Sequence, residues 1–216
     1  MMKIFLVSIL ALLISGASFG QKELLAYKIT YRIADSLNAI GEINRFDSTI
    51  FKVADSLNHC HPIGYFKVAG ELLNKSQYNE AAFMYYLGIL RYRYYNAVNP
   101  NYKPEDDGAL FASLKNAMND PINMYQRINI DNFISVLKKV TKYTAENDYA
   151  FYSRSNNIDK YNELTDKYNV MIGDLETNKE KYSAQWNNER IEFEKNIDTM
   201  LDEQKQGEAG DKKKSK

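Results

Sequence analysis

The chain has little cysteine, histidine and proline, and each shortage excludes a class of structure. Its 216 residues include one cysteine, two histidines and four prolines. One cysteine cannot form an intramolecular disulfide, so the fold must depend on an apolar core. The run His59, Cys60 and His61 offers too few ligands for a metal site unless carboxylates join it from elsewhere. We therefore expect no metal ion and no cofactor.

An excess of charge of either sign is also absent. The chain has 28 basic and 28 acidic residues, and its formal net charge is +0. This balance gives no reason to expect a nucleic-acid partner through bulk electrostatics. The one basic run, between Lys212 and Lys216, belongs to a predicted disordered tail at 206–216.

The first twenty residues have the pattern of a secretory signal peptide. Lys3 precedes an apolar run from Ile4 to Ile14, and small residues follow as far as Gly20. The run is shorter than the roughly 20 residues that cross a bilayer, so we expect cleavage near Gln21 and no integral membrane segment afterwards. The ending Ser-Phe-Gly-Gln resembles export signals of Bacteroidota, a group of Gram-negative bacteria. That resemblance implies an exported protein in the periplasm, with the cell exterior as an alternative.

The rest of the chain predicts an all-α fold. Prolines stand at positions 62, 100, 104 and 121, where the apolar periodicity lapses, and strict alternation typical of strands is not sustained anywhere. A helical domain is predicted at 21–150, with an irregular stretch after Pro121, and a long amphipathic segment at 151–205. The predicted helices of the domain span about 23–39, 48–58, 65–74, 78–96, 108–118 and 131–146.

The run from Glu80 to Tyr94 is apolar on almost every side. A helix without a polar face is normally surrounded by others, so this run is the predicted centre of the core. Gly88 lies within it, although glycine costs about 1 kcal/mol relative to alanine in a helix. We expect a neighbouring helix to pass close to Gly88.

Residues 65–96 resemble one tetratricopeptide-type helical hairpin. The resemblance lies in Ala69-Gly70 of the first helix and in Tyr78-Asn79-Glu80-Ala81-Ala82 and Tyr85 of the second. Together with the runs 109–111 and 121–125, the hairpin is similar to a family of exported helical proteins of Gram-negative bacteria. This similarity implies a helical fold and export, and it implies no activity.

Arg91 and Arg93 differ from their apolar surroundings. With the tyrosines beside them they would line a groove for an anionic or sugar-like ligand. The alternative, which we favour, is that both guanidinium groups reach solvent or pair with acids while their stems cover apolar surface. A buried arginine here would need a carboxylate partner. The candidates for that partner are Glu71, Glu80, Asp106 and Asp107.

From Asn157 to about Gln204 the apolar residues narrow to a coiled-coil-like seam with two seven-residue registers. One register holds Ile158, Thr165, Ile172, Lys179, Trp186, Phe193 and Met200, and the other holds Tyr161, Tyr168, Leu175 and Tyr182. The helix either folds back at a break, predicted at Gly173, or projects towards a partner. That partner would be another copy or a different envelope protein, with Trp186 and Phe193 as anchors. The alternative is a solvated helix packed on its own domain.

These patterns predict a non-catalytic, exported interaction or scaffold protein of the cell envelope. A second hypothesis is a periplasmic immunity or inhibitor protein that neutralises a toxin or an enzyme. A third is an enzyme acting on cell-wall material, with paired carboxylates drawn from Glu71, Glu80, Asp106 and Asp107. The spacing of these acids in the sequence does not decide between the hypotheses.

Overall fold

The computed structural model describes the backbone of residues 20–214, with the side chains of residues 22–204. Over this range the chain forms helices and turns and no strand, which confirms the predicted all-α fold. The predicted signal peptide lies outside the described residues apart from Gly20. No helix in the described part of the chain has both the length and the apolar character needed to cross a membrane.

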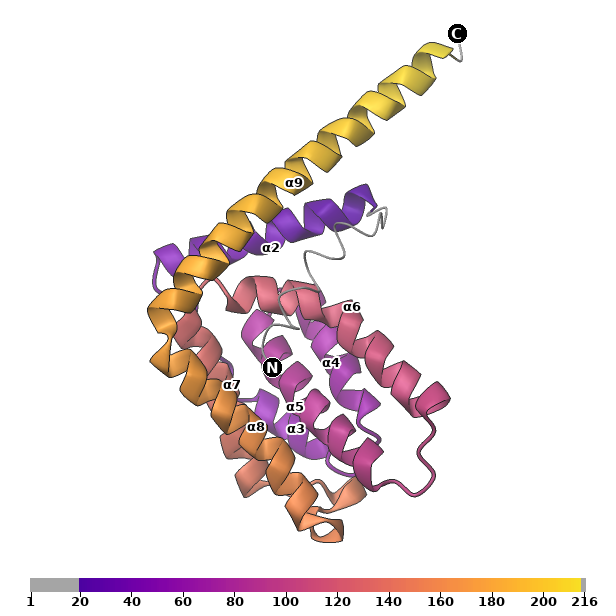
Figure 1. Ribbon diagram of the computed structural model, residues 1–216, viewed down its shortest axis with the longest axis vertical. Coiled ribbons are helices and arrows are strands. Elements are labelled where there is room, and N and C mark those ends of the chain that lie inside the picture. The colour runs from indigo at the N-terminus through magenta and orange to yellow at the C-terminus, as the bar shows by residue number, and fades with distance from the viewer. Residues whose placement is uncertain (1–19, 215–216) are drawn as a thin grey trace. The chain divides into compact units, whose positions relative to one another are not determined.

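The helices follow one another with short connections (Figure 1). The α-helices are α2 (Gln21–Ala39), α3 (Ile50–Ser56), α4 (Ile63–Asn74), α5 (Tyr78–Val98), α6 (Ala109–Gln126), α7 (Ile130–Glu146), α8 (Ile158–Thr177) and α9 (Lys179–Lys214). Three short turns of other helix types complete them: η1 (Pro104–Gly108), η2 (Ala150–Tyr152) and η3 (Arg154–Asn156). The backbone of α9 therefore includes most of the predicted tail.

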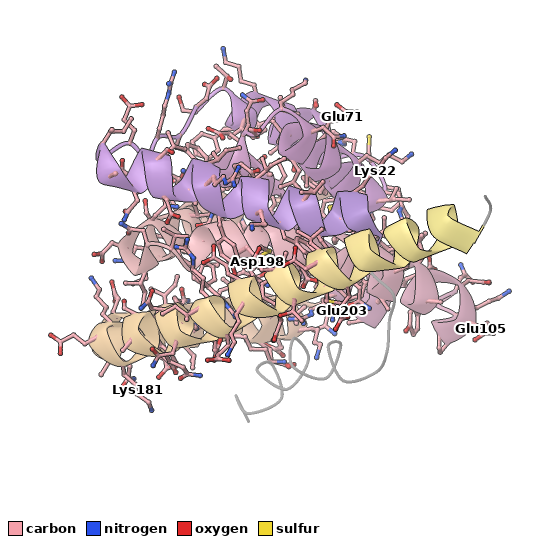
Figure 2. The ribbon with its side chains drawn as sticks, turned by 90° about the horizontal axis from the view of Figure 1, so that it is seen from above. Lys22, Glu71, Glu105, Lys181, Asp198 and Glu203 are labelled. Carbon is pink, nitrogen blue, oxygen red and sulfur yellow. The ribbon has the colours of Figure 1, made fainter. Side chains whose placement is uncertain are left out.

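The chain divides into two compact units. Among the described residues, 20–29 and 190–214 form the smaller unit, and Thr30–Glu189 form the larger one. In the smaller unit the first part of α2, up to Ile29, and the part of α9 from Arg190 lie side by side, with Asp198 between their ribbons in Figure 2. The Tyr27 and Phe193 ring centroids are 5.8 Å apart, and Lys28 pairs with Asp198. The Tyr27–Phe193 ring contact and the Lys28–Asp198 ion pair are therefore among the contacts that join the two helices of this unit.

Helix α5 is the centre of the larger unit. All its residues from Tyr78 to Tyr92 are buried, and α4, α6, α7 and α8 pack around it (Figure 1). This confirms the prediction drawn from its apolar pattern. A helix in this position has no solvent-facing side, so each polar group on it must find its partner inside the protein.

Helices α4 and α5 come unusually close at Gly88. A Cβ atom placed on Gly88 would lie 2.9 Å from Tyr65 Cβ and 3.1 Å from Phe66 Cε2, which confirms the predicted close neighbour. The turn between the two helices puts Ser76 in the left-handed region, at φ 57°. There Gln77 N–H donates to Leu72 O at 2.9 Å, which closes the end of α4.

A buried network of amide side chains joins α5 to its neighbours. Asn79 on α5 donates to the carbonyls of Ile43 and Arg45, at 2.8 and 2.7 Å. Its Oδ1 accepts from Gln126 on α6 and from Asn132 on α7, at 3.1 and 2.8 Å. Because both the donor and the acceptor of Asn79 are used, the network fixes these segments to one another without the cost of an unpaired buried amide.

The predicted irregular stretch after Pro121 is wrong, because Pro121 lies inside α6. Proline removes one backbone hydrogen bond and costs about 3 kcal/mol within a helix. Here Ile122 and Tyr125 follow it and are almost fully buried, at 0% and 2% exposure. Their packing offsets the proline, so tertiary contacts determine the length of this helix.

The predicted break at Gly173 is also wrong. Helix α8 continues through Gly173 to Thr177, and the break falls at Asn178, before α9 begins. The Asn178 side chain donates to Asp174 O and Asp174 Oδ1, at 3.1 and 2.9 Å, which closes the end of α8. The exposed Gly173 therefore lies within a continuous helix.

The two glycines provide a matched test of the close approach between α4 and α5. We expect Gly88→Ala to lower the free energy of unfolding by about 1–3 kcal/mol, because the new methyl group overpacks the Tyr65 contact. Gly173→Ala, whose added methyl group would meet nothing within 4 Å, should raise stability by up to about 1 kcal/mol. Urea denaturation measures both. Equal stabilisation by the two changes would contradict the packing at Gly88.

Buried tyrosines make stability depend on alkaline pH. Burial raises the pKa of Tyr65, Tyr92 and Tyr125 to about 12, because the interior disfavours the phenolate. An unfolded tyrosine titrates at about pH 10. The neutral phenols therefore stabilise the fold fully below about pH 10, and this stabilisation is lost as pH rises towards 12. Urea titrations over this range should show a falling free energy of unfolding. Loss of phenolate absorbance near pH 10 in the Tyr65→Phe, Tyr92→Phe or Tyr125→Phe variant, relative to the unaltered protein with native circular dichroism, would contradict it.

Candidate functional site

A surface pocket of about 400 Å³ lies in the larger unit, where α7 meets the break between α8 and α9. We call it the lysine groove. Its lining residues are Asp131, Ile134, Ser135, Lys138, Lys139, Lys142, Glu176 and Lys179. On α7 the positions 131, 135, 138 and 142 recur every three or four residues, so they share one face of the helix. Ile134 and Lys139 are also on α7, while Glu176 comes from α8 and Lys179 from α9.

Three of the four lysines in the groove have carboxylate partners. Lys138 Nζ is 2.6 Å from Glu176 Oε1, and Lys179 pairs with Asp131. Lys142 Nζ is 3.9 Å from Glu146 Oε1 on the same helix. These pairs are largely solvent-exposed, and such pairs contribute at most about 1 kcal/mol each, so an incoming anion can displace them at low cost.

Lys139 differs from the other lysines of the groove. Its Nζ donates to Ser135 Oγ at 2.7 Å and lies 4.9 Å from the centroid of the Phe46 ring. Within the described part of the chain it forms no ion pair. Partial burial lowers its pKa, because the ammonium loses hydration there. An anion beside Lys139 would stabilise the ammonium charge in place of the lost water.

The predicted seam contacts its own domain over most of its length. Tyr161, Tyr168, Leu175, Tyr182 and Trp186 are all buried. Tyr168 OH donates to Tyr86 O at 2.8 Å, and the Trp186 ring lies 5.6 Å from Tyr182 and 6.2 Å from Phe133.

The Arg127 guanidinium lies over the Trp186 ring, with Cζ 5.5 Å from the ring centroid. A partner role for Tyr168, Tyr182 and Trp186 stays a prediction, and in the free chain these rings are covered by the larger unit. Phe193, in the smaller unit, is half-buried against Tyr27.

The expectation that the Arg91 guanidinium reaches solvent or pairs with an acid is wrong. Arg91 has 0% exposure, because α5 is enclosed on every side. Its Cζ lies 5.1, 5.4 and 4.9 Å from the ring centroids of Tyr65, Tyr143 and Tyr149. Cation–π contacts of this kind contribute about 0.5–2 kcal/mol each. Arg93, two residues later, is half-buried.

The acids considered for catalysis make separate local contacts. Glu80 is buried and accepts the Asp47 N–H at 2.5 Å, while Glu71 is exposed on α4 (Figure 2). Asp106 lies 3.9 Å from Lys103 Nζ, and Asp107 lies 3.7 Å from His61 Nε2. The structure therefore places these carboxylates in different surroundings.

His61 closes the start of α4, where its Nδ1 accepts the Ile63 N–H at 3.2 Å. Burial lowers the pKa of His61, although Asp107 opposes the shift. Among the described residues, no three side chains of histidine, cysteine, aspartate or glutamate gather into a group that could hold a metal ion.

Sequence reasoning missed the lysine groove. The spacing of Lys138 and Lys142 with Asp131 was a readable signal of a charged face on α7. Glu176 and Lys179 join that face through the packing of α8 and the start of α9, and nothing in their local sequence indicates it.

Comparison of the chain with protein-family models, with curated proteins and with solved structures gives no match.

Proposed function

We propose that this chain is a non-catalytic helical interaction protein of the bacterial cell envelope. It binds an acidic segment of a partner protein in the lysine groove. The observation that carries the proposal is Lys139, an ammonium held in a groove, against an aromatic ring and without a carboxylate partner in the described part of the chain.

An extended row of carboxylates fits the groove better than a single small anion does. The α7 members run from Asp131 to Lys142, and this length of helix spans about 16 Å. Lys138 and Lys142 extend from the exposed rim of this row, and Lys139 lies deeper against Phe46. A segment with several acidic side chains would exchange the weak internal pairs for contacts with its own carboxylates.

The remaining predictions belong to the same proposal. Export to the periplasm places the protein among envelope partners, and the pairing of α4 with α5 is interpreted as a tetratricopeptide-like hairpin within a scaffold. Self-association through the C-terminal helix, with Phe193 as an anchor, is a further way to present more than one groove. An immunity or inhibitor protein would use the groove in the same way, with a toxin or enzyme as its acidic partner.

A direct test uses a fluorescent peptide of repeated Glu-Glu-Leu-Glu units and a second peptide with glutamine in place of each glutamate. Fluorescence anisotropy at low salt should show binding of the acidic peptide alone. The triple variant Lys138→Gln, Lys139→Gln, Lys142→Gln should weaken that binding about ten-fold or more, since three charge contacts of about 0.5–1 kcal/mol each are removed.

The matched control removes three exposed lysines elsewhere in the larger unit, with Lys52→Gln, Lys67→Gln and Lys75→Gln. This variant has the same change in net charge and should bind as the unaltered protein does. Equal weakening in both variants would show that bulk charge, not the groove, attracts the peptide. Equal binding of the two peptides, or binding of neither, would also contradict the proposal.

A further inference from the structure

A second feature of the larger unit lies away from the lysine groove and has a different chemistry. Arg91 is the largest of the fully buried side chains. Its guanidinium is enclosed by the rings of Tyr65 from α4, Tyr143 from α7, and Tyr149 before η2. We call this enclosure the tyrosine cage. It places a permanent positive charge in the protein interior, because arginine does not lose its proton there.

The described residues form hydrogen bonds with one of the three guanidinium nitrogens of Arg91. Arg91 Nη1 donates to Asn58 Oδ1 and to Tyr65 OH. Within the described residues, Arg91 Nε and Nη2 are buried and have no hydrogen-bond acceptor. These two nitrogens form one edge of the guanidinium, and their parallel N–H groups are the pair that binds a carboxylate in a two-point contact.

The surrounding protein compensates this charge only in part. The aromatic faces attract it, but a buried charge without an opposite charge or a full set of hydrogen bonds is strongly disfavoured. Asp55 is a carboxylate in contact with the cage, where it accepts the Tyr143 OH at 2.5 Å and lies at the exposed outer side of that ring. Asp55 therefore acts on Arg91 through Tyr143 and leaves the Nε and Nη2 edge unpaired.

The connection between α3 and α4 covers the cage. Asn58 contributes its side chain to Arg91 while its carbonyl accepts the Phe151 N–H at 2.8 Å. Cys60 O accepts the Tyr149 OH, also at 2.8 Å, and both His59 and Cys60 are exposed. These hydrogen bonds hold the connection over the cage, with His59 and Cys60 on its exposed side.

We propose that the Nε and Nη2 edge of Arg91 binds a small monovalent anion inside the tyrosine cage. A carboxylate the size of formate or acetate matches the two parallel donors, and chloride supplies the same charge with a single contact point. The bound anion neutralises the buried charge of Arg91 and stabilises the packing of the α3–α4 connection against α5. This site is independent of the lysine groove and of any partner protein.

The test measures the thermal midpoint of the purified full chain, first exchanged into a sodium gluconate buffer whose anion is too bulky for the cage. Sodium formate, acetate or chloride then replaces gluconate at constant ionic strength. We expect a saturable rise of several degrees with at least one small anion, since ligand binding to the folded state stabilises it by mass action. A rise with formate or acetate but not chloride identifies a carboxylate site, and the reverse identifies a chloride site.

Two variants separate the cage from general salt effects. Arg91→Met should abolish the rise and should be at least as stable as the unaltered protein in gluconate, because a buried charge has been replaced by an apolar side chain. Arg93→Met, which changes the half-buried neighbouring arginine, should keep the full rise.

If Arg91→Met does not fold, Arg91→Lys provides the same comparison. It keeps a positive charge and lacks the paired donors, so the response to formate or acetate should fall at least ten-fold in apparent affinity. Absence of a rise in the unaltered protein, or an equal rise in the Arg91 variants, would overturn the proposal.

Discussion

The burial of α5 on every side is the constraint on which the rest of the structure depends. Polar side chains on a central helix cannot reach solvent, so each of them needs a hydrogen-bond partner on a neighbouring helix or connection. Asn79 is satisfied by the segment before α3 and by α6 and α7. Glu80 accepts a backbone N–H from the same segment. Arg91, Tyr92 and Asn96 are exceptions in the described structure, because Arg91 Nε and Nη2, Tyr92 OH and Asn96 Oδ1 are buried without a hydrogen-bond partner.

Helix α7 connects the two anion-binding features of this protein. Its inner face contributes Tyr143 to the tyrosine cage, and its outer face carries Lys138 and Lys142 of the lysine groove. Tyr143 and Lys142 are adjacent in sequence and point to different sides, as neighbouring residues on a helix do. A change at one face of α7 can therefore be made without removing a side chain from the other. For this reason the groove and the cage are separable by mutation.

The parts of the fold that depend on local pattern were predictable from the sequence. The all-round apolar character of the run around Gly88 indicated both a central helix and a close neighbour, and α4 passes there. The parts that depend on tertiary packing were not. Pro121 signals a helix end, yet the burial of Ile122 and Tyr125 keeps α6 continuous. The break before α9 occurs at Asn178 rather than at the exposed Gly173.

In the candidate sites, too, the local pattern was predictable from the sequence and the tertiary surroundings were not. Arg91 is conspicuous in the sequence, but its burial among tyrosines depends on residues from α4, α7 and the stretch before η2. An arginine in an apolar helix can also cover apolar surface with its stem and extend its guanidinium to solvent. The local sequence therefore favoured an exposed guanidinium, which is wrong for Arg91. The lysine groove depends on the meeting of α7 with the α8–α9 break. The sequence indicates the charged face of α7, but it does not indicate that Glu176 and Lys179 form the other wall of the groove.

Native-state hydrogen exchange of the α5 amides is the most direct test of the central position of this helix. If α5 is enclosed on every side, its amides from Met84 to Tyr92 should exchange only through global unfolding, with the free energy found from urea denaturation. Amides of α8, which has exposed residues along one side, should include some that exchange through smaller openings. Faster exchange in α5 than in α8, at a free energy below that of global unfolding, would contradict the account.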